Sequence, residues 1–110
     1  MKPILIAALV VFAQASPAIA QEAGNAKAGA KLAQTVCAQC HAIGPELKRS
    51  PNPMAPGFAS VAAWPGMTDR ALRVWLQSSH PTMPNFVLSR SERDSVVAYI
   101  LSLKGGSSAM

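Results

Sequence analysis

The stretch Cys37-Ala38-Gln39-Cys40-His41 holds both cysteines of this 110-residue chain. The cysteines lie three positions apart, and a histidine follows the second one directly. Such a group is compatible with a disulfide, with part of a metal site, with a thiol redox pair, or with the attachment of a covalently bound group. The surrounding sequence distinguishes between these alternatives.

Three of the alternatives fit poorly. A thioredoxin-like redox pair requires a βαβ setting, and the sequence has no strand-like alternation of apolar and polar residues. A disulfide across so short a loop adds little stability, and it leaves His41 without a role. Zinc requires four ligands. The two cysteines, His41 and His80 supply that number, but the adjacent Cys40 and His41 cannot easily bind one ion.

The pattern C-x-x-C-H is the signature of covalent haem attachment. At about 100° per residue, Cys37, Cys40 and His41 fall on one face of a helix. Two thiols on that face can form thioethers with the vinyl groups on one edge of a porphyrin, and the imidazole is then directed at the iron. We therefore predict one haem c, attached through Cys37 and Cys40, with His41 as an axial iron ligand.

The N-terminus resembles a secretory signal peptide. Lys2 precedes an apolar run from Ile4 to Ala13, and Ala18-Ile19-Ala20 forms an A-x-A cleavage site. The run is too short for a transmembrane anchor, which needs roughly 20 apolar residues. We predict a signal peptide over 1–20, a single domain over 21–104 and a flexible tail over 105–110. The expected location is the periplasm, without stable membrane insertion.

The composition of the predicted mature chain limits its partners. After loss of Lys2, nine Lys and Arg stand against five Asp and Glu, which gives a net charge of +4. The basic residues are dispersed and no aromatic residues alternate with them, which argues against a nucleic-acid groove. A mildly positive surface fits an acidic protein partner, and ordinary solubility charge explains it equally well.

The predicted mature chain has five aromatic residues, which are few for a hydrophobic core. A bound group is therefore expected to complete the core.

Three helices are predicted, over 25–41, 68–79 and 90–104. Asn25 and Thr68 are suitable N-caps, and Ser89-Arg90-Ser91-Glu92 reads as a capping box. Gly29 permits close approach of another backbone in the first helix. The segment 44–66 contains five of the nine prolines and is expected to form a long loop with one turn near 58–63. The predicted fold class is therefore all-α, with three main helices and a long Pro-rich loop around one haem.

Met83 is the expected second axial ligand. It lies between Pro81 and Pro84, which make the segment stiff and non-helical. Such a segment can hold a thioether against iron with little loss of entropy. His80 and Met54 are the alternatives, whereas Met67 lies too close to a helix start.

The chain resembles the class I c-type cytochromes, in particular small monohaem bacterial members, over residues 24–103. The resemblance rests on Gly29 before the CAQCH motif, on the Pro-Thr-Met-Pro loop, and on the segment 96–100. It implies the cytochrome c fold, in which the first and last helices cross closely and Gly29 packs near Tyr99.

The resemblance also implies a proline carbonyl that accepts a hydrogen bond from the haem-binding histidine. Pro56 fits the family pattern better than Pro45, so Pro56 is the predicted residue. The segment before the methionine is shorter than in mitochondrial-type members. This leaves open whether Trp64 or Trp75 reaches a haem propionate. For Trp75, a purely core position is favoured.

The resulting functional prediction is a periplasmic one-electron carrier, not an enzyme, in which haem c with His/Met ligation cycles between Fe(III) and Fe(II). The expected partners are redox proteins with an acidic docking face, and the expected state is a monomer. Two alternatives stay open: a haem protein with a labile sixth ligand that binds gas or acts on peroxide, and the cytochrome subunit of a periplasmic dehydrogenase.

Overall fold

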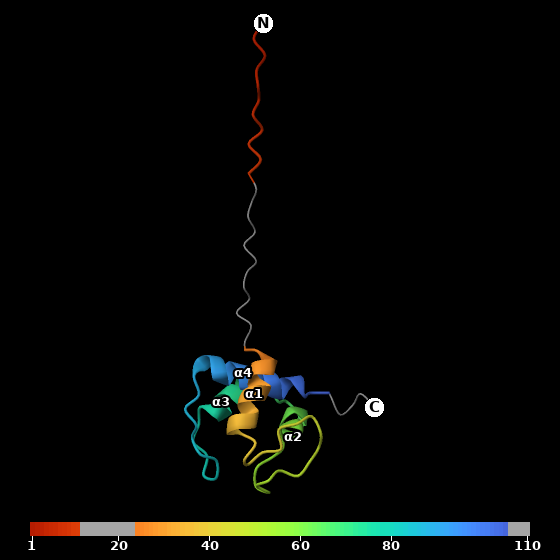
Figure 1. Cartoon of the computed structure of the whole chain (residues 1–110), viewed down its shortest axis with the longest axis vertical. Helices are drawn as coiled ribbons and strands as arrows, with labels where there is room; N and C mark the ends of the chain where they lie inside the picture. Colours follow the sequence, from red (N-terminus) through yellow and green to blue (C-terminus); the bar gives the residue numbers. More distant parts are fainter. Residues whose placement is uncertain (12–23, 106–110) are drawn as a thin grey trace.

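The computed structural model describes residues 1–11 and 24–105. Residues 1–11 contain no helix or strand. Residues 24–105 contain four helices and no strand, as Figure 1 shows: α1 (Ala26–Val36), α2 (Phe58–Ala63), α3 (Asp69–Leu76) and α4 (Arg90–Ser102). The all-α prediction is confirmed. The predicted cleavage point after Ala20 and the tail over 106–110 lie outside the described residues.

Three of the helices begin at the predicted caps. The Asn25 side chain accepts hydrogen bonds from the backbone N–H groups of Lys27 and Ala28, at 2.9 and 3.1 Å. Thr68 caps α3 in the same way. Ser89 and Glu92 form the reciprocal capping box of α4. Because each cap satisfies N–H groups that have no partner inside the helix, these starts follow from local sequence.

The end of α1 differs from the prediction, which placed the CAQCH motif on the helix. The N–H groups of Cys37 and Ala38 both donate to the Ala33 carbonyl, at 2.9 Å each. This shared acceptor interrupts the regular helical pattern, and α1 ends at Val36. The N–H groups of Cys40 and His41 then donate to the Cys37 carbonyl, at 3.1 and 2.9 Å. The motif therefore forms a separate turn that follows the helix.

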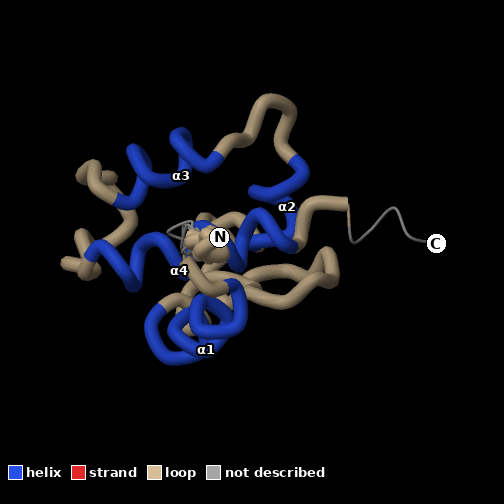
Figure 2. Tube along the Cα trace, turned by 90° about the horizontal axis from the view of Figure 1, so that it is seen from above, coloured by secondary structure: helices blue, strands red, loops and turns tan. Residues whose placement is uncertain are grey.

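Helix α4 is the centre of the fold and contacts α1, α2 and α3. In Figure 2, α1 lies on one side of α4 and α3 lies on the other. At the crossing of α1 and α4, a Cβ atom on Gly29 would overlap the Ser95 carbonyl and lie 2.9 Å from the Tyr99 Cβ. The expected close approach of Gly29 to Tyr99 is confirmed.

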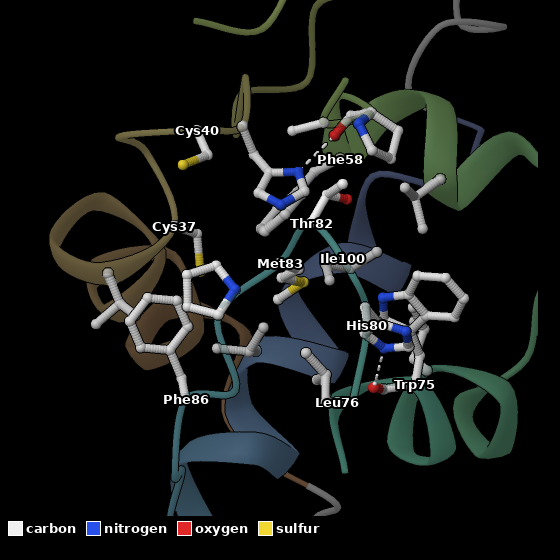
Figure 3. A pocket seen from close by; sticks show the side chains of 18 of the residues that line it. Cys37, Cys40, Phe58, Trp75, Leu76, His80, Thr82, Met83, Phe86 and Ile100 are labelled. Atoms are coloured by element: carbon white, nitrogen blue, oxygen red, sulfur yellow. Dashed lines mark hydrogen bonds between the residues drawn. The ribbon is translucent and has the colours of Figure 1, made fainter. Parts of the chain in front are cut away.

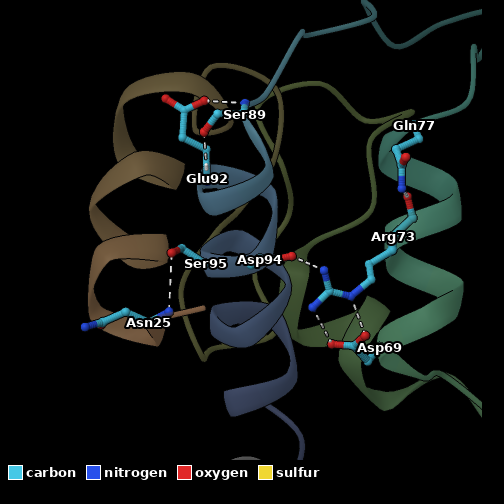
Figure 4. Close-up of polar contacts among 8 residues, drawn as sticks. All are labelled: Asn25, Asp69, Arg73, Gln77, Ser89, Glu92, Asp94 and Ser95. Atoms are coloured by element: carbon cyan, nitrogen blue, oxygen red, sulfur yellow. Dashed lines mark hydrogen bonds and ion pairs between the residues drawn. The ribbon is translucent and has the colours of Figure 1, made fainter. Parts of the chain in front are cut away.

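Arg73 connects α3 to α4. Its guanidinium contacts Asp69 within α3 and Asp94 on α4, as Figure 4 shows. Hydrogen bonding with Asp69 raises the pKa of Arg73, so the side chain stays charged. The contact fixes the position of α3 relative to the α1–α4 pair.

The buried core consists mostly of small side chains, and the largest fully buried ones are Val96 and Val97. Phe58, Leu72 and Ile100 are buried as well, but several large apolar side chains are exposed, including Trp64 at 47% and Trp75 at 53%. The prediction that Trp75 is a core residue is therefore wrong. Met54 and Phe86 are exposed as well, and all four side chains line one cavity.

Candidate functional site

A cavity of about 250 Å³ adjoins the turn that follows α1. Its walls come from this turn, the loop over 52–56, helices α2, α3 and α4, and the loop between α3 and α4. Figure 3 shows many of the side chains that line it. The lining is largely apolar and includes no Lys, Arg, Asp or Glu among the described residues. A space of this kind suits a large apolar ligand.

His41 is held in one orientation at the cavity wall. Its Nδ1 lies 2.6 Å from the carbonyl oxygen of Pro56. Because a carbonyl oxygen only accepts, Nδ1 carries the proton and donates it to this bond. The other ring nitrogen, Nε2, then keeps its lone pair and is able to bind a metal. Of the two candidate prolines, Pro56 is the one that makes this contact.

Backbone hydrogen bonds bring Pro56 to His41. The Asn52 N–H donates to the Cys40 carbonyl at 3.1 Å, and the Phe58 N–H donates to the Ala42 carbonyl at 2.8 Å. These two bonds hold the start and the end of the proline-rich segment against the CAQCH turn. The Phe58 ring also contacts the His41 ring, with centroids 5.3 Å apart.

Cys37 and Cys40 are free thiols that line the same cavity. Burial raises the pKa of the Cys37 thiol to about 11, so this thiol is protonated at neutral pH. The described residues bring together no group of three or more His, Cys, Asp and Glu side chains able to hold a metal ion. Nothing in this part of the chain supports the zinc alternative.

The residues considered as a second axial ligand, Met83, His80, Met54 and Met67, all line the cavity. Met83 is partly buried, and Figure 3 shows it among the lining side chains. Met54 is 75% exposed. Met67 is partly buried at the edge of the core. The Nε2 atom of His80 is already engaged, because it lies 2.7 Å from the Trp75 carbonyl oxygen.

Two contacts near the site were not predicted from the sequence. The His80 ring stacks on Trp75 with centroids 3.7 Å apart and planes inclined by 16°. The Tyr99 hydroxyl donates to the Ile43 carbonyl at 2.6 Å, close behind the CAQCH turn. Neither contact has a local sequence signal, because each depends on how the loops fold back on the helices.

The residues of the cavity fit a haem group. Apolar side chains of α2, α3 and α4 offer walls for a flat macrocycle, and exposed aromatic side chains form part of the rim. Two free thiols lie on the wall that also carries His41, whose Nε2 is available as a ligand. Three thioethers, those of Met54, Met67 and Met83, and the second imidazole, that of His80, line the same space. This combination of donors matches the ligand types of c-type haem.

Comparisons with known proteins agree with this site. Residues 24–100 match the family model described as cytochrome c oxidase, cbb3-type, subunit III. Cytochrome c-552 of Bradyrhizobium diazoefficiens is 40% identical over 96 residues, which cover 87% of this chain and 88% of that protein. No solved structure matches the chain. The chain therefore belongs to the small c-type cytochromes and is an electron carrier with covalently bound haem c.

Proposed function

We propose that this chain is a periplasmic one-electron carrier with one haem c, bound through Cys37 and Cys40 and ligated axially by His41 and Met83. The observation that carries the proposal is the His41 tautomer: the Pro56 carbonyl holds the proton on Nδ1 and leaves Nε2 free beside a cavity that Met83 also lines. A site with these two ligands leaves the iron no open position for a substrate.

Bound in this cavity, haem iron supplies one-electron chemistry between Fe(III) and Fe(II). His41 contributes an electron-rich nitrogen, because its Nδ1–H is hydrogen-bonded to Pro56. A Met83 thioether favours the ferrous state and raises the reduction potential. The apolar lining favours the state of lower charge and therefore acts in the same direction.

Met83 is preferred over the other sulfur and nitrogen donors for reasons of burial and engagement. Met54 is mainly in solvent. Its side chain would therefore lose more conformational freedom on binding iron than the partly buried side chain of Met83. His80 has its Nε2 committed to a backbone carbonyl. Met83 is partly buried and is flanked by Pro81 and Pro84, which limit the backbone conformations of the segment.

The periplasmic location is inferred from the predicted signal peptide over 1–20. Within residues 1–11 and 24–105, no helix is long and apolar enough to span a bilayer. Intact mass of the protein isolated from a periplasmic fraction tests the location. The expected mass is that of residues 21–110 plus one haem.

The partners are proposed to be redox proteins that present an acidic face, since the predicted mature chain carries a net charge of +4. Association steered by charge is brief and salt-sensitive. A second candidate is a stable subunit of a larger redox complex, because the matching family model is described for an oxidase subunit. Size-exclusion chromatography of the native protein separates the two, since a free carrier elutes as a monomer.

Carbon monoxide tests the closed coordination. The reduced holoprotein is expected to show no spectral change under carbon monoxide, because Met83 occupies the sixth position. Met83→Ala is expected to bind the gas, whereas the control Met54→Ala is expected to behave like the wild type. A spectral change in the wild type would favour gas binding or peroxide chemistry instead. An unreactive Met83→Ala would show that another residue is the ligand.

A further inference from the structure

The loop over 79–88 carries Met83 and has few connections to the rest of the fold. Its internal backbone hydrogen bonds run from Phe86 to Pro84 and from Leu88 to Phe86, at 3.0 and 3.1 Å. Pro81 and Pro84 have no N–H to donate. Among the described residues, His80 makes the hydrogen bond that links this loop to another element. His80 is therefore the hydrogen-bonded link between this loop and α3.

His80 is fixed by two contacts of different kinds. Its Nε2 lies 2.7 Å from the Trp75 carbonyl oxygen, which can only accept, so Nε2 is the donor. Its ring also lies flat on the Trp75 indole, with centroids 3.7 Å apart, and Figure 3 shows both contacts. The hydrogen bond fixes where the ring edge lies, and the stacking fixes the plane of the ring.

The end of α3 is a firm anchor for His80. The last carbonyls of a helix have no partner within it. Here the Arg73 carbonyl accepts from the Gln77 side chain at 2.9 Å, and the Val74 carbonyl accepts from the Ser78 hydroxyl at 2.5 Å. The Trp75 carbonyl accepts from the Ser78 backbone N–H at 3.1 Å and also from His80 Nε2 at 2.7 Å. Since Arg73 also joins α3 to α4 through Asp94 (Figure 4), this helix end is held by the core.

We infer that His80 is a positioning residue for Met83, and that its contacts with Trp75 keep the thioether at the iron. This inference rests on the proposed axial role of Met83. His80 lies three positions before Met83, with Pro81 restricting the backbone between them. Anchoring of His80 on α3 therefore limits how far the Met83 backbone moves from the cavity. In this arrangement His80 acts through Met83, and its Nε2 is used in the anchor.

The test measures how fast and how tightly imidazole binds the ferric holoprotein, since an external ligand needs Met83 to leave first. His80→Ala removes both contacts and is expected to bind imidazole about five- to tenfold more tightly, because apparent affinity follows the fraction with Met83 released. His80→Gln keeps a donor, His80→Phe keeps an aromatic ring, and both are expected to give intermediate values. The matched control is Val87→Ala, in the same loop and 95% exposed, which is expected to match the wild type.

A second readout separates positioning from general stabilisation. Weaker sulfur ligation is expected to lower the reduction potential of His80→Ala, in the same order as the imidazole affinities. A change in thermal stability with unchanged imidazole binding and potential would overturn the inference. If His80→Ala does not fold, the Gln and Phe variants decide, and wild-type behaviour of both would overturn it as well.

Met83→Ala distinguishes this inference from the proposal on which it rests. If Met83→Ala binds imidazole no better than the wild type, the axial assignment of Met83 is wrong. If Met83→Ala responds strongly and all His80 variants behave like the wild type, the assignment stands and only the positioning role of His80 is overturned.

Discussion

Single residues in this protein are oriented by backbone carbonyls. The Pro56 carbonyl sets the tautomer of His41, the Ile43 carbonyl holds the Tyr99 hydroxyl, and the Trp75 carbonyl holds His80. The sequence predicts candidate haem-attachment and ligand side chains, because their types and spacing are informative. It does not predict these acceptors by itself, because a carbonyl belongs to every residue. The resemblance to known cytochromes was needed to favour Pro56 over Pro45.

Tyr99→Phe tests one such contact. The substitution keeps the ring, whose centroid lies 6.4 Å from the centroid of the Phe58 ring. It removes the hydroxyl that donates to the Ile43 carbonyl oxygen at 2.6 Å. We expect the free energy of unfolding of the holoprotein to fall by about 1 kcal/mol, the net contribution of a typical hydrogen bond. Denaturant unfolding followed by circular dichroism measures it. An unchanged midpoint would show that this bond contributes nothing to stability.

At the scale of helices, local sequence explains the starts better than the ends. Asn25, Thr68 and Ser89 cap their helices as predicted, since capping depends on residues within one turn. The first helix was predicted to continue to His41, whereas α1 ends at Val36. There, two N–H groups share the Ala33 carbonyl, and the turn that follows is held by Asn52 and Phe58 from a distant segment. Such tertiary contacts leave no periodic signal in the sequence.

Gly29→Ala tests the crossing of α1 and α4. In an isolated helix this change would be stabilising by about 1 kcal/mol. Here the new Cβ would overlap the Ser95 carbonyl, which is backbone and cannot move alone. We expect a net loss of about 1–3 kcal/mol in unfolding free energy, as for other overpacked sites.

Gly44→Ala is the control for this substitution. A Cβ at Gly44 would meet no atom within 4 Å, so its effect is expected to stay within about 0.5 kcal/mol. Stabilisation of the protein by Gly29→Ala would contradict the close helix contact.

At the scale of the whole molecule, the protein chain supplies an incomplete core. Its largest fully buried side chains are valines, and several large apolar side chains around the cavity are exposed to solvent. The low aromatic content predicted this feature, because composition determines how much apolar area a small domain can bury. The composition did not predict which side chains would line the cavity, since that depends on the paths of the two long loops.

Removal of the haem attachment tests this view of the core. The double variant Cys37→Ala, Cys40→Ala cannot form thioethers and is expected to lose covalent haem, as a haem-stained denaturing gel would show. Haem-free protein is expected to lose most helical circular dichroism and to unfold without a cooperative transition, because small domains depend on such bound groups. Cooperative unfolding of haem-free protein near the wild-type midpoint would show that the chain completes its core alone.

The central claim, that His41 and Met83 close the coordination of one haem, is tested most directly by nuclear magnetic resonance of the reduced holoprotein with labelled methionine methyl groups. A methyl group held over the face of a porphyrin is shifted strongly upfield by the ring current. We predict one such signal, which is lost in Met83→Leu and retained in Met54→Leu and Met67→Leu. Loss of the shifted signal in either control variant, or its absence from the wild type, would contradict the claim.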